Sequence, residues 1–196
     1  MSGSVAAILL AAGKSRRMGC CKQLLPLGNS TVIARCLDTL VASGIDEIAV
    51  VVSPEVHGVA EAARKHPVRV VVNSDANGDM ASSVRAGRDA LTAEAVGVIV
   101  FLCDYPLVSA GTITGLVMEH GDSPGSIIIP CQGGKRGHPL LFPRMILNEL
   151  ENGLTLRDLV RRDQSRISYL NVDDPGVLLD MDTPDDYRLI RGMMPQ

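Results

Sequence analysis

Apolar runs alternate with segments of helical periodicity along the first two thirds of the chain. Short, mostly β-branched runs predict buried strands at 5–10, 48–52, 68–72 and 96–102. Apolar residues at helical spacing between these runs predict helices at about 32–43, 54–66, 81–91 and from 109 onward. Strands that read as continuous apolar runs and alternate with helices are typical of a mostly parallel sheet. The pattern therefore predicts an α/β fold with helices on both faces of that sheet.

The last third of the chain is less regular. Extended segments are expected at 126–130, 140–142, 167–172 and 177–179, with short helices at 144–151 and 155–162. Near the end, Thr183 is suited to be an N-cap and Pro184 the first residue of a helix. No repeat, low-complexity tract or linker divides the sequence, so residues 1–196 are expected to form a single domain.

Composition narrows the class of protein. Hydrophobic residues make up 46% of the 196 residues, yet no run reaches membrane-spanning length and the N-terminus lacks a signal-peptide pattern. Five cysteines without metal-ligand spacing fit a reducing compartment. These features predict a soluble, cytoplasmic protein. A net charge of −3 and only 3% aromatic residues argue against nucleic acid as a partner.

A basic loop follows the first predicted strand. It contains Gly13, Arg16, Arg17 and Lys22. Small residues let backbone N–H groups approach an anion, and arginine and lysine neutralise it; the alternative is a solvated surface turn. In parallel sheets, ligands gather outside the carboxyl ends of the strands, a rule that brings the 73–83 segment and Asp104 to the same edge. This convergence favours a phosphate site.

Two acidic residues are candidates for holding a metal ion. Asp104 directly follows the longest apolar run, where it either caps the following loop or binds a cation. Asp182 precedes the last helix and is not needed as its cap if Thr183 fills that role, although Asp180 is a rival for the second position. Two carboxylates that meet a triphosphate suit Mg²⁺, which takes few protein ligands together with phosphate oxygens and water.

Three other groups of residues, the Ser82–Ser83 pair, His138 and the Cys20–Cys21 pair, could have either a functional or an ordinary structural role. Ser82 and Ser83 open a predicted helix, where they either hold a base or ribose or cap the helix, and on pattern alone capping is favoured. His138 lies on a glycine-rich basic loop and either steadies a phosphate or is a plain loop residue. Cys20 and Cys21 stand beside basic residues that could lower a thiol pKa, but incidental thiols are the simpler interpretation.

Several motifs together resemble those of one family. They read Leu10-Ala11-Ala12-Gly13-x-Ser15-x-Arg17-Met18-Gly19-x-x-Lys22, Gly78-x-Met80-x-Ser82-Ser83, Asp104-x-Pro106, Gly137-His138-Pro139 and Asp180-x-Asp182-Thr183-Pro184. In order and over nearly the whole chain, these resemble the MobA-like nucleotidyltransferases, and among them most closely the molybdenum cofactor cytidylyltransferases.

The resemblance implies a fold, a division of the chain and a set of site residues. The fold would be the Rossmann-like nucleotide-diphospho-sugar transferase fold, with the nucleotide held by residues 1–120 and the acceptor by residues 121–196. Lys22, Arg17 and Asp104 would be catalytic, Arg16 would add supporting charge, and Asp104 and Asp182 would hold Mg²⁺. His138 and Arg157 would face the acceptor. The implied nucleotide-binding residues are Leu10, Ala11, Ala12, Gly13, Arg17, Lys22, Asn73, Gly78 and Ser83.

The implied reaction is transfer of CMP from CTP to the terminal phosphate of molybdenum-molybdopterin, for eventual delivery to a molybdoenzyme. Ala12 stands where the guanylyl branch typically has glycine, which favours CTP over GTP. The alternatives are a guanylyltransferase, a transferase acting on another phosphorylated small molecule, and a non-catalytic carrier of the molybdenum cofactor. The chain departs from the family at Cys103, at Tyr105 and at 155–157, which leaves the acceptor in doubt.

Overall fold

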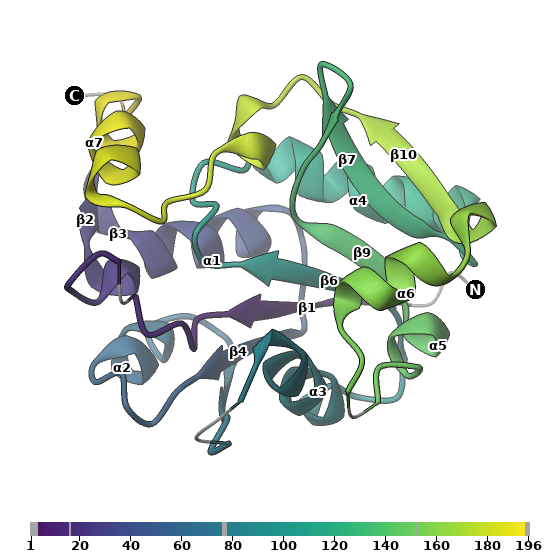
Figure 1. Ribbon diagram of the computed structural model, residues 1–196, viewed down its shortest axis with the longest axis horizontal. Coiled ribbons are helices and arrows are strands. Elements are labelled where there is room, and N and C mark those ends of the chain that lie inside the picture. Colours follow the sequence, from purple (N-terminus) through teal and green to yellow (C-terminus); the bar gives the residue numbers. More distant parts are fainter. Residues whose placement is uncertain (1–3, 16, 76–77, 152, 195–196) are drawn as a thin grey trace.

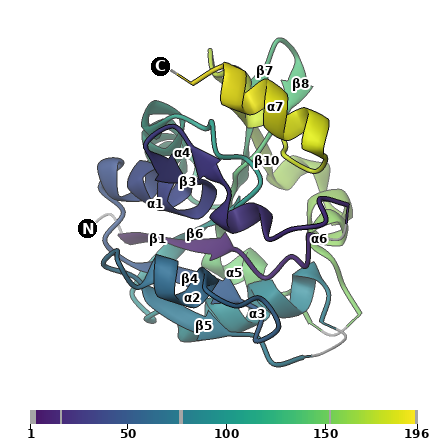
Figure 2. The same cartoon turned by 90° about the vertical axis from the view of Figure 1, so that its left-hand side faces the viewer.

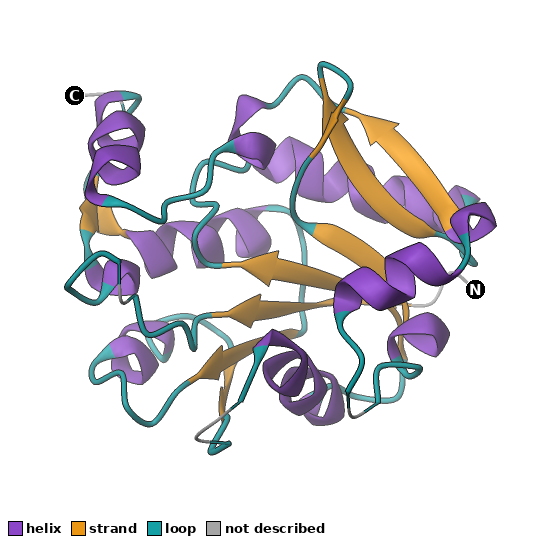
Figure 3. Cartoon of the chain, viewed as in Figure 1, coloured by secondary structure: helices purple, strands orange, loops and turns teal. Residues whose placement is uncertain are grey.

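A twisted, mostly parallel sheet runs through the whole molecule (Figures 1 and 3). The computed structural model describes residues 4–15, 17–75, 78–151 and 153–194, so Arg16 lies outside the described residues. The strand order is β10-β7-β9-β6-β1-β4-β5, with β8 beside β7. The parallel half consists of β1 (Ser4–Leu10), β4 (Ile48–Val52), β5 (Arg69–Val72) and β6 (Ala95–Leu102).

The second half of the sheet contains an inserted antiparallel strand. Strand β9 (Leu140–Pro143) runs antiparallel to β6 on one side and to β7 (Ile127–Gln132) on the other. Strand β10 (Ile167–Asn171) then pairs with β7 in parallel, and β8 (Lys135–Arg136) turns back along β7. Apart from β9 and the two-residue β8, the strands of the sheet run parallel to one another, so the sheet is mostly parallel, as the sequence predicts.

Helices cover both faces of the sheet, because each buried strand presents alternate apolar side chains to opposite sides. Ala7 and Leu9 pack with α1 (Val32–Ala42), α2 (Val59–Ala63) and α4 (Ala110–Asp122). Ala6 and Ile8 pack with α3 (Met80–Ala90), α5 (Arg144–Leu147) and α6 (Leu156–Arg162). The structure therefore confirms the predicted fold class. None of the helices in the described residues has the length and apolar character needed to span a bilayer.

The C-terminal helix closes one end of the molecule. Helix α7 (Pro184–Gly192) begins as the sequence predicts, with Thr183 as N-cap; the Thr183 side chain accepts from Asp186 N, and Thr183 N donates in return to the Asp186 carboxylate. It packs beside a short hairpin of β2 (Pro26–Leu27) and β3 (Ser30–Thr31), where the Tyr187 hydroxyl donates to Pro26 O at 2.7 Å. Figure 2 looks onto the edge where β1, β4 and β6 end, with α7 above that edge and α2 and α3 below it.

Some predicted elements are shorter or different in kind. The helix expected from residue 54 begins only at Val59, because Gly58 adopts a left-handed φ of +80° that a helix does not continue through. The helix expected at 144–151 ends at Leu147. The extended piece expected at 177–179 is part of a 3-10 helix, η3 (Pro175–Leu178), which Asp174 caps. Helix α1 begins at the predicted residue 32, and its N-cap is Thr31, whose side chain accepts from Ala34 N.

One buried histidine predicts how the stability of the fold depends on pH. His120 is 4% exposed, and neither ring nitrogen has a hydrogen-bond partner among the described residues. Burial lowers its pKa below the ordinary 6.5. The neutral ring therefore contributes stability above pH 6.5, and this contribution is lost as the pH falls through the lowered pKa.

We expect urea unfolding to show a lower free energy of unfolding at about pH 5.5 than at about pH 7.5, by at most roughly 1.4 kcal/mol, because pH 5.5 lies about one unit below the ordinary histidine pKa of 6.5. A His120→Phe variant removes the titrating group from the same position. If the variant loses as much stability over this pH range as the wild type does, the pH dependence arises elsewhere.

Candidate active site

Loops that follow four parallel strands enclose a cleft at one edge of the sheet. Its volume is about 270 Å³. The sequence-predicted residues that line it are Leu10, Ala12, Gly13, Lys22, Asn73, Gly78, Ser83 and Asp104. Ala11 does not line the cleft, because it is fully buried and its N–H continues the sheet by donating to Val51 O at 2.8 Å. Most of the predicted nucleotide residues thus border one space.

A buried glutamine that the sequence analysis missed shapes the basic loop. Gln23 Nε2 donates to Ala11 O at 3.1 Å and to Gly13 O at 2.7 Å, so the side chain bridges the start of the loop. Gln23 Oε1 accepts hydrogen bonds from Ser15 Oγ and Cys21 Sγ, both at 3.3 Å. Ser15 has a left-handed φ of +48°, which turns the chain back toward Lys22. The loop is therefore held by internal hydrogen bonds and does not behave as a loose surface turn.

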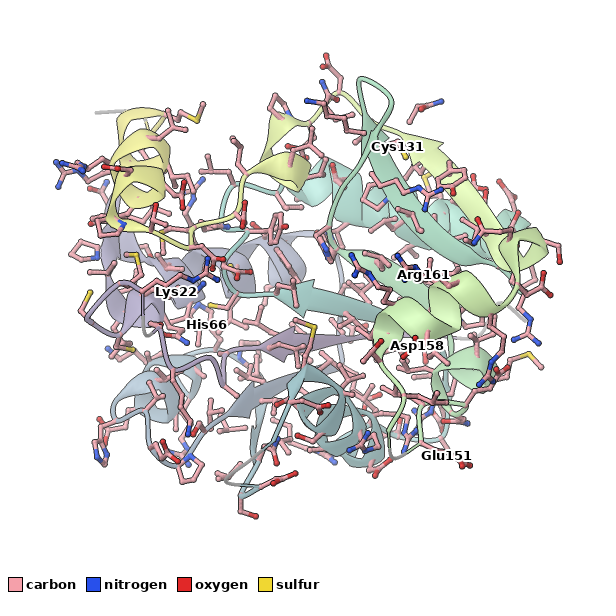
Figure 4. All side chains as sticks on the ribbon, viewed as in Figure 1. Lys22, His66, Cys131, Glu151, Asp158 and Arg161 are labelled. Atoms are coloured by element: carbon pink, nitrogen blue, oxygen red, sulfur yellow. The ribbon has the colours of Figure 1, made fainter. Side chains whose placement is uncertain are left out.

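Lys22 joins the two aspartates that the sequence singled out. Its Nζ donates to Asp104 Oδ2 at 3.0 Å, to Asp182 Oδ1 at 2.9 Å and to Met181 O at 3.0 Å. Arg17 Nη2 donates to the other oxygen, Asp182 Oδ2, at 2.7 Å. Figure 4 shows Lys22 between the ends of β1 and β6 and the segment that leads to α7. Both carboxylates therefore lie within 3.0 Å of one nitrogen atom.

Backbone contacts bring these distant aspartates together. Met181 N donates to Asp104 O at 2.8 Å, which fixes the segment before α7 against the end of β6. Eight residues before Asp182 in the chain, the buried Asp174 accepts hydrogen bonds from Ser109 N at 2.9 Å and from the Thr112 hydroxyl at 2.6 Å. These bonds attach the same C-terminal segment to the start of α4. Asp182, and not its rival Asp180, therefore reaches Lys22; Asp180 is exposed.

The charges of this cluster support one another. Burial lowers the pKa of the Lys22 ammonium, but Asp104 and Asp182 outweigh this effect, so its pKa is raised above the ordinary value. The hydrogen bond from Lys22 lowers the pKa of Asp182 against the effect of burial, and Arg17 lowers it further. The ion pairs of the cluster therefore favour the charged forms of Lys22 and Asp182.

The donor set fits a small divalent cation such as Mg²⁺. Asp104 Oδ1 is buried and accepts no hydrogen bond within the described part of the chain. This carboxylate oxygen is therefore available as a ligand for a cation. The described residues contain no cluster of three or more His, Cys, Asp or Glu side chains suited to a metal ion. Two carboxylates are enough for Mg²⁺, because this ion usually takes one or two protein carboxylates and completes its coordination shell with water and phosphate oxygens.

The far end of the cleft is built from polar groups that hold one another. Asn73 Nδ2 donates to Ser82 Oγ at 2.9 Å and to Ser83 Oγ at 3.0 Å. The cap of α3 is Asp79, whose Oδ1 accepts from Ser82 N at 2.8 Å, so the prediction that the serines cap this helix is wrong. A Cβ on Gly78 would lie 2.6 Å from Ser82 Oγ, and only glycine fits this close approach.

The predicted acceptor residues lie outside the cleft lining. The ring of His138 stands 4.9 Å from that of Tyr105, and its backbone N–H donates to Val177 O. Burial lowers the pKa of His138, whereas burial and the charges of Asp180, Asp104 and Asp182 raise that of Tyr105 to about 12. His138 therefore lies near enough to Asp104 and Asp180 for their charges to act on it, but it does not line the cleft. Arg157 is exposed on α6 and is not among the residues that line the cleft.

The adjacent thiols differ from each other. Cys20 is exposed, whereas Cys21 is partly buried and donates to Gln23. Burial raises the pKa of the Cys21 thiol. The possibility that neighbouring basic residues lower this pKa is therefore wrong for Cys21, which acts as a structural hydrogen-bond donor.

Comparison with known proteins identifies the family. Residues 7–167 match the model of the MobA-like NTP transferase domain. The chain belongs to the MobA-like NTP transferases. Purine catabolism protein PucB of Bacillus subtilis is 31% identical over 95% of this chain and 96% of its own length. Nicotine blue oxidoreductase of Paenarthrobacter nicotinovorans is 28% identical over the same shares.

Solved structures agree with this assignment to the MobA-like NTP transferases. A nucleotidyl transferase from Methanothermobacter superposes with a TM-score of 0.86 at 26% identity, covering 97% of both chains. Rv0371c of Mycobacterium tuberculosis, in complex with manganese, gives a TM-score of 0.76 at 26% identity, covering 98% of this chain and 100% of its own. The fold is that of the nucleotide-diphospho-sugar transferases, and the protein is a nucleotidyltransferase.

Proposed function

We propose that this nucleotidyltransferase transfers CMP from CTP to the terminal phosphate of molybdenum-molybdopterin and releases pyrophosphate. The observation that carries the proposal is the cluster of Lys22 and Arg17 on Asp104 and Asp182 at the mouth of the cleft. A protein that only carries the molybdenum cofactor has no need of a complete set of residues for binding a triphosphate and a metal ion. The name of one relative describes an oxidoreductase, but paired carboxylates with a lysine and an arginine are better suited to phosphates and a divalent cation.

The chemistry needs little beyond positioning and charge. An oxygen of the acceptor phosphate attacks the α-phosphorus of CTP in line, the bond to the bridging β-phosphate oxygen breaks, and pyrophosphate leaves with its electrons. Because the acceptor phosphate is already ionised at neutral pH, no strong general base is required. Mg²⁺ held by Asp104 and Asp182 would neutralise the developing charge on the phosphate oxygens. Lys22 would hold the α-phosphate, and Arg17 the departing pyrophosphate.

The nucleotide part of the site is proposed within residues 1–120. The cleft-lining Leu10, Ala12, Gly13, Asn73, Gly78 and Ser83 would border the base and ribose. Ala12 lines the cleft, and its methyl group would leave less room for a base than glycine would, which favours a pyrimidine over a purine. Residues 121–196 would contribute the acceptor side, where His138 and Arg157 stand outside the nucleotide cleft. A cytoplasmic location and delivery of the product to a molybdoenzyme belong to the same proposal.

Titration with each of CTP, GTP, ATP and UTP in the presence of Mg²⁺ tests the choice of base. We expect CTP to bind most tightly and GTP at least about tenfold more weakly, a difference of roughly 1.4 kcal/mol. An Ala12→Gly variant should narrow this gap by improving GTP binding. Preference of the wild type for GTP would contradict the cytidylyl proposal and favour a guanylyltransferase.

Pyrophosphate release separates an enzyme from a carrier. With CTP, Mg²⁺ and isolated molybdopterin cofactor, we expect release that depends on the acceptor. If both ligands bind and no pyrophosphate appears, the protein is a carrier. If release occurs only with another phosphorylated acceptor, the nucleotidyltransferase assignment stands and the molybdopterin proposal is wrong.

A further inference from the structure

All three protons of the Lys22 ammonium are already used within the protein. Its acceptors are Asp104 Oδ2, Asp182 Oδ1 and Met181 O, at 3.0, 2.9 and 3.0 Å. An ammonium group has three donors and no acceptor, so this arrangement satisfies it fully. The Lys22 side chain is only 11% exposed, and Nζ lies between the two carboxylates.

This arrangement conflicts with the two roles that the proposed function assigns to the cluster. In this position Lys22 cannot donate to a triphosphate without giving up one of its three present bonds. A divalent cation shared by Asp104 and Asp182 would meet a positive charge within a few ångströms, where the repulsion is strong in a partly desolvated site. The carboxylate pair therefore holds either the ammonium or the cation in this geometry, and not both.

A nucleotide phosphate resolves the conflict. Lys22 lines the cleft together with Gly13, so a phosphate entering there offers it a charged acceptor in exchange for a carboxylate. Movement of the ammonium toward the phosphate frees Asp104 Oδ2 and Asp182 Oδ1. The backbone segments that carry the two aspartates stay in place, because the Met181 N–Asp104 O bond does not involve Lys22, and Arg17 still pairs with the Asp182 carboxylate.

We infer that Lys22 is the resident counter-ion of the Asp104–Asp182 pair in the nucleotide-free protein, so that a divalent cation binds together with the nucleotide and not before it. The inference rests on the proposed role of the two aspartates as cation ligands. Binding of cation and nucleotide is then positively coupled, and by linkage each strengthens the other to the same degree. Free divalent cation is excluded by a positive charge that the protein itself supplies.

Titration of Mn²⁺ into the nucleotide-free protein, followed by the electron paramagnetic resonance signal of free Mn²⁺, tests this inference directly. Lys22→Met removes the competing charge, and Lys22→Gln removes the charge but keeps a hydrogen-bond donor between the carboxylates. We expect both variants to bind Mn²⁺ at least about tenfold more tightly than the wild type. Lys14→Met is the matched control, because Lys14 borders the same cleft but pairs with Glu55 at 2.8 Å, and its Mn²⁺ affinity should equal that of the wild type.

Equal or weaker Mn²⁺ binding in both Lys22 variants would overturn the inference, as would an equal gain in Lys14→Met. The glutamine variant guards against the case in which methionine lets the carboxylates move apart. The titration contains no acceptor and measures no turnover, so the absence of CMP transfer would leave its result intact. The reverse outcome is also distinguishable. If the wild type releases pyrophosphate but the Lys22 variants bind Mn²⁺ no more tightly than the wild type, the proposed function stands and this inference is wrong.

Discussion

Replacing Asp104 by asparagine is expected to lower kcat/KM for CTP by about 10³-fold or more, because a neutral amide is a poor ligand for a divalent cation at a site of phosphoryl transfer. The substitution changes few atoms, and Lys22 keeps its bonds to Asp182 and Met181. We therefore expect the variant to remain folded, with a loss of stability of roughly 1–3 kcal/mol. Pyrophosphate release measures the activity, and urea unfolding measures the stability.

Asp180→Asn is the matched control for this loss of activity. Asp180 is two residues from Asp182, but its side chain is exposed and it is not among the three acceptors of Lys22. Its neutralisation should change kcat/KM by less than about threefold. If the two variants lose activity equally, a general effect of negative charge explains the result and Asp104 holds no special position.

Lys22→Met is expected to lower kcat/KM by roughly 10²–10³-fold, because it removes a charged donor aimed at the reacting phosphate. The same change should raise the affinity of the nucleotide-free protein for Mn²⁺. If Lys22 had only a structural role, its replacement would partly unfold the site and would lower both the turnover and the affinity for the cation. Slower turnover together with tighter cation binding therefore separates the two roles. Steady-state kinetics alongside the Mn²⁺ titration provides the check. Lys135→Met, on the exposed strand β8, removes an equal charge elsewhere and should leave kcat/KM unchanged.

The helices and strands that the sequence predicts correctly are those marked by patterns among residues close together in the chain. Buried parallel strands read as apolar runs, so β1, β4, β5 and β6 were predicted within one residue at each end. The start of α7 was predictable because the Thr183–Pro184 cap uses neighbours in the chain. The hairpin of β2 and β3 was missed, since two strands of two residues leave no periodicity to detect.

The site was only partly predictable, for a physical reason. The motifs indicate that Lys22, Asp104 and Asp182 carry chemistry, but their meeting depends on contacts between residues far apart in the chain. The bond from Met181 N to Asp104 O and the buried Asp174 at the start of α4 are of this kind. Gln23 was missed because its role, bridging Ala11 O and Gly13 O, exists only once the loop is folded.

Anomalous diffraction from a crystal grown with CTP and Mn²⁺ tests most directly whether Asp104 and Asp182 share one cation with a triphosphate. The account predicts a single manganese peak within roughly 2.0–2.3 Å of an oxygen from each carboxylate and of a CTP phosphate oxygen. In that crystal, Lys22 Nζ should contact a phosphate and no longer bridge the two aspartates. A manganese peak on the phosphates that touches neither carboxylate, with Lys22 still between Asp104 and Asp182, would contradict the account.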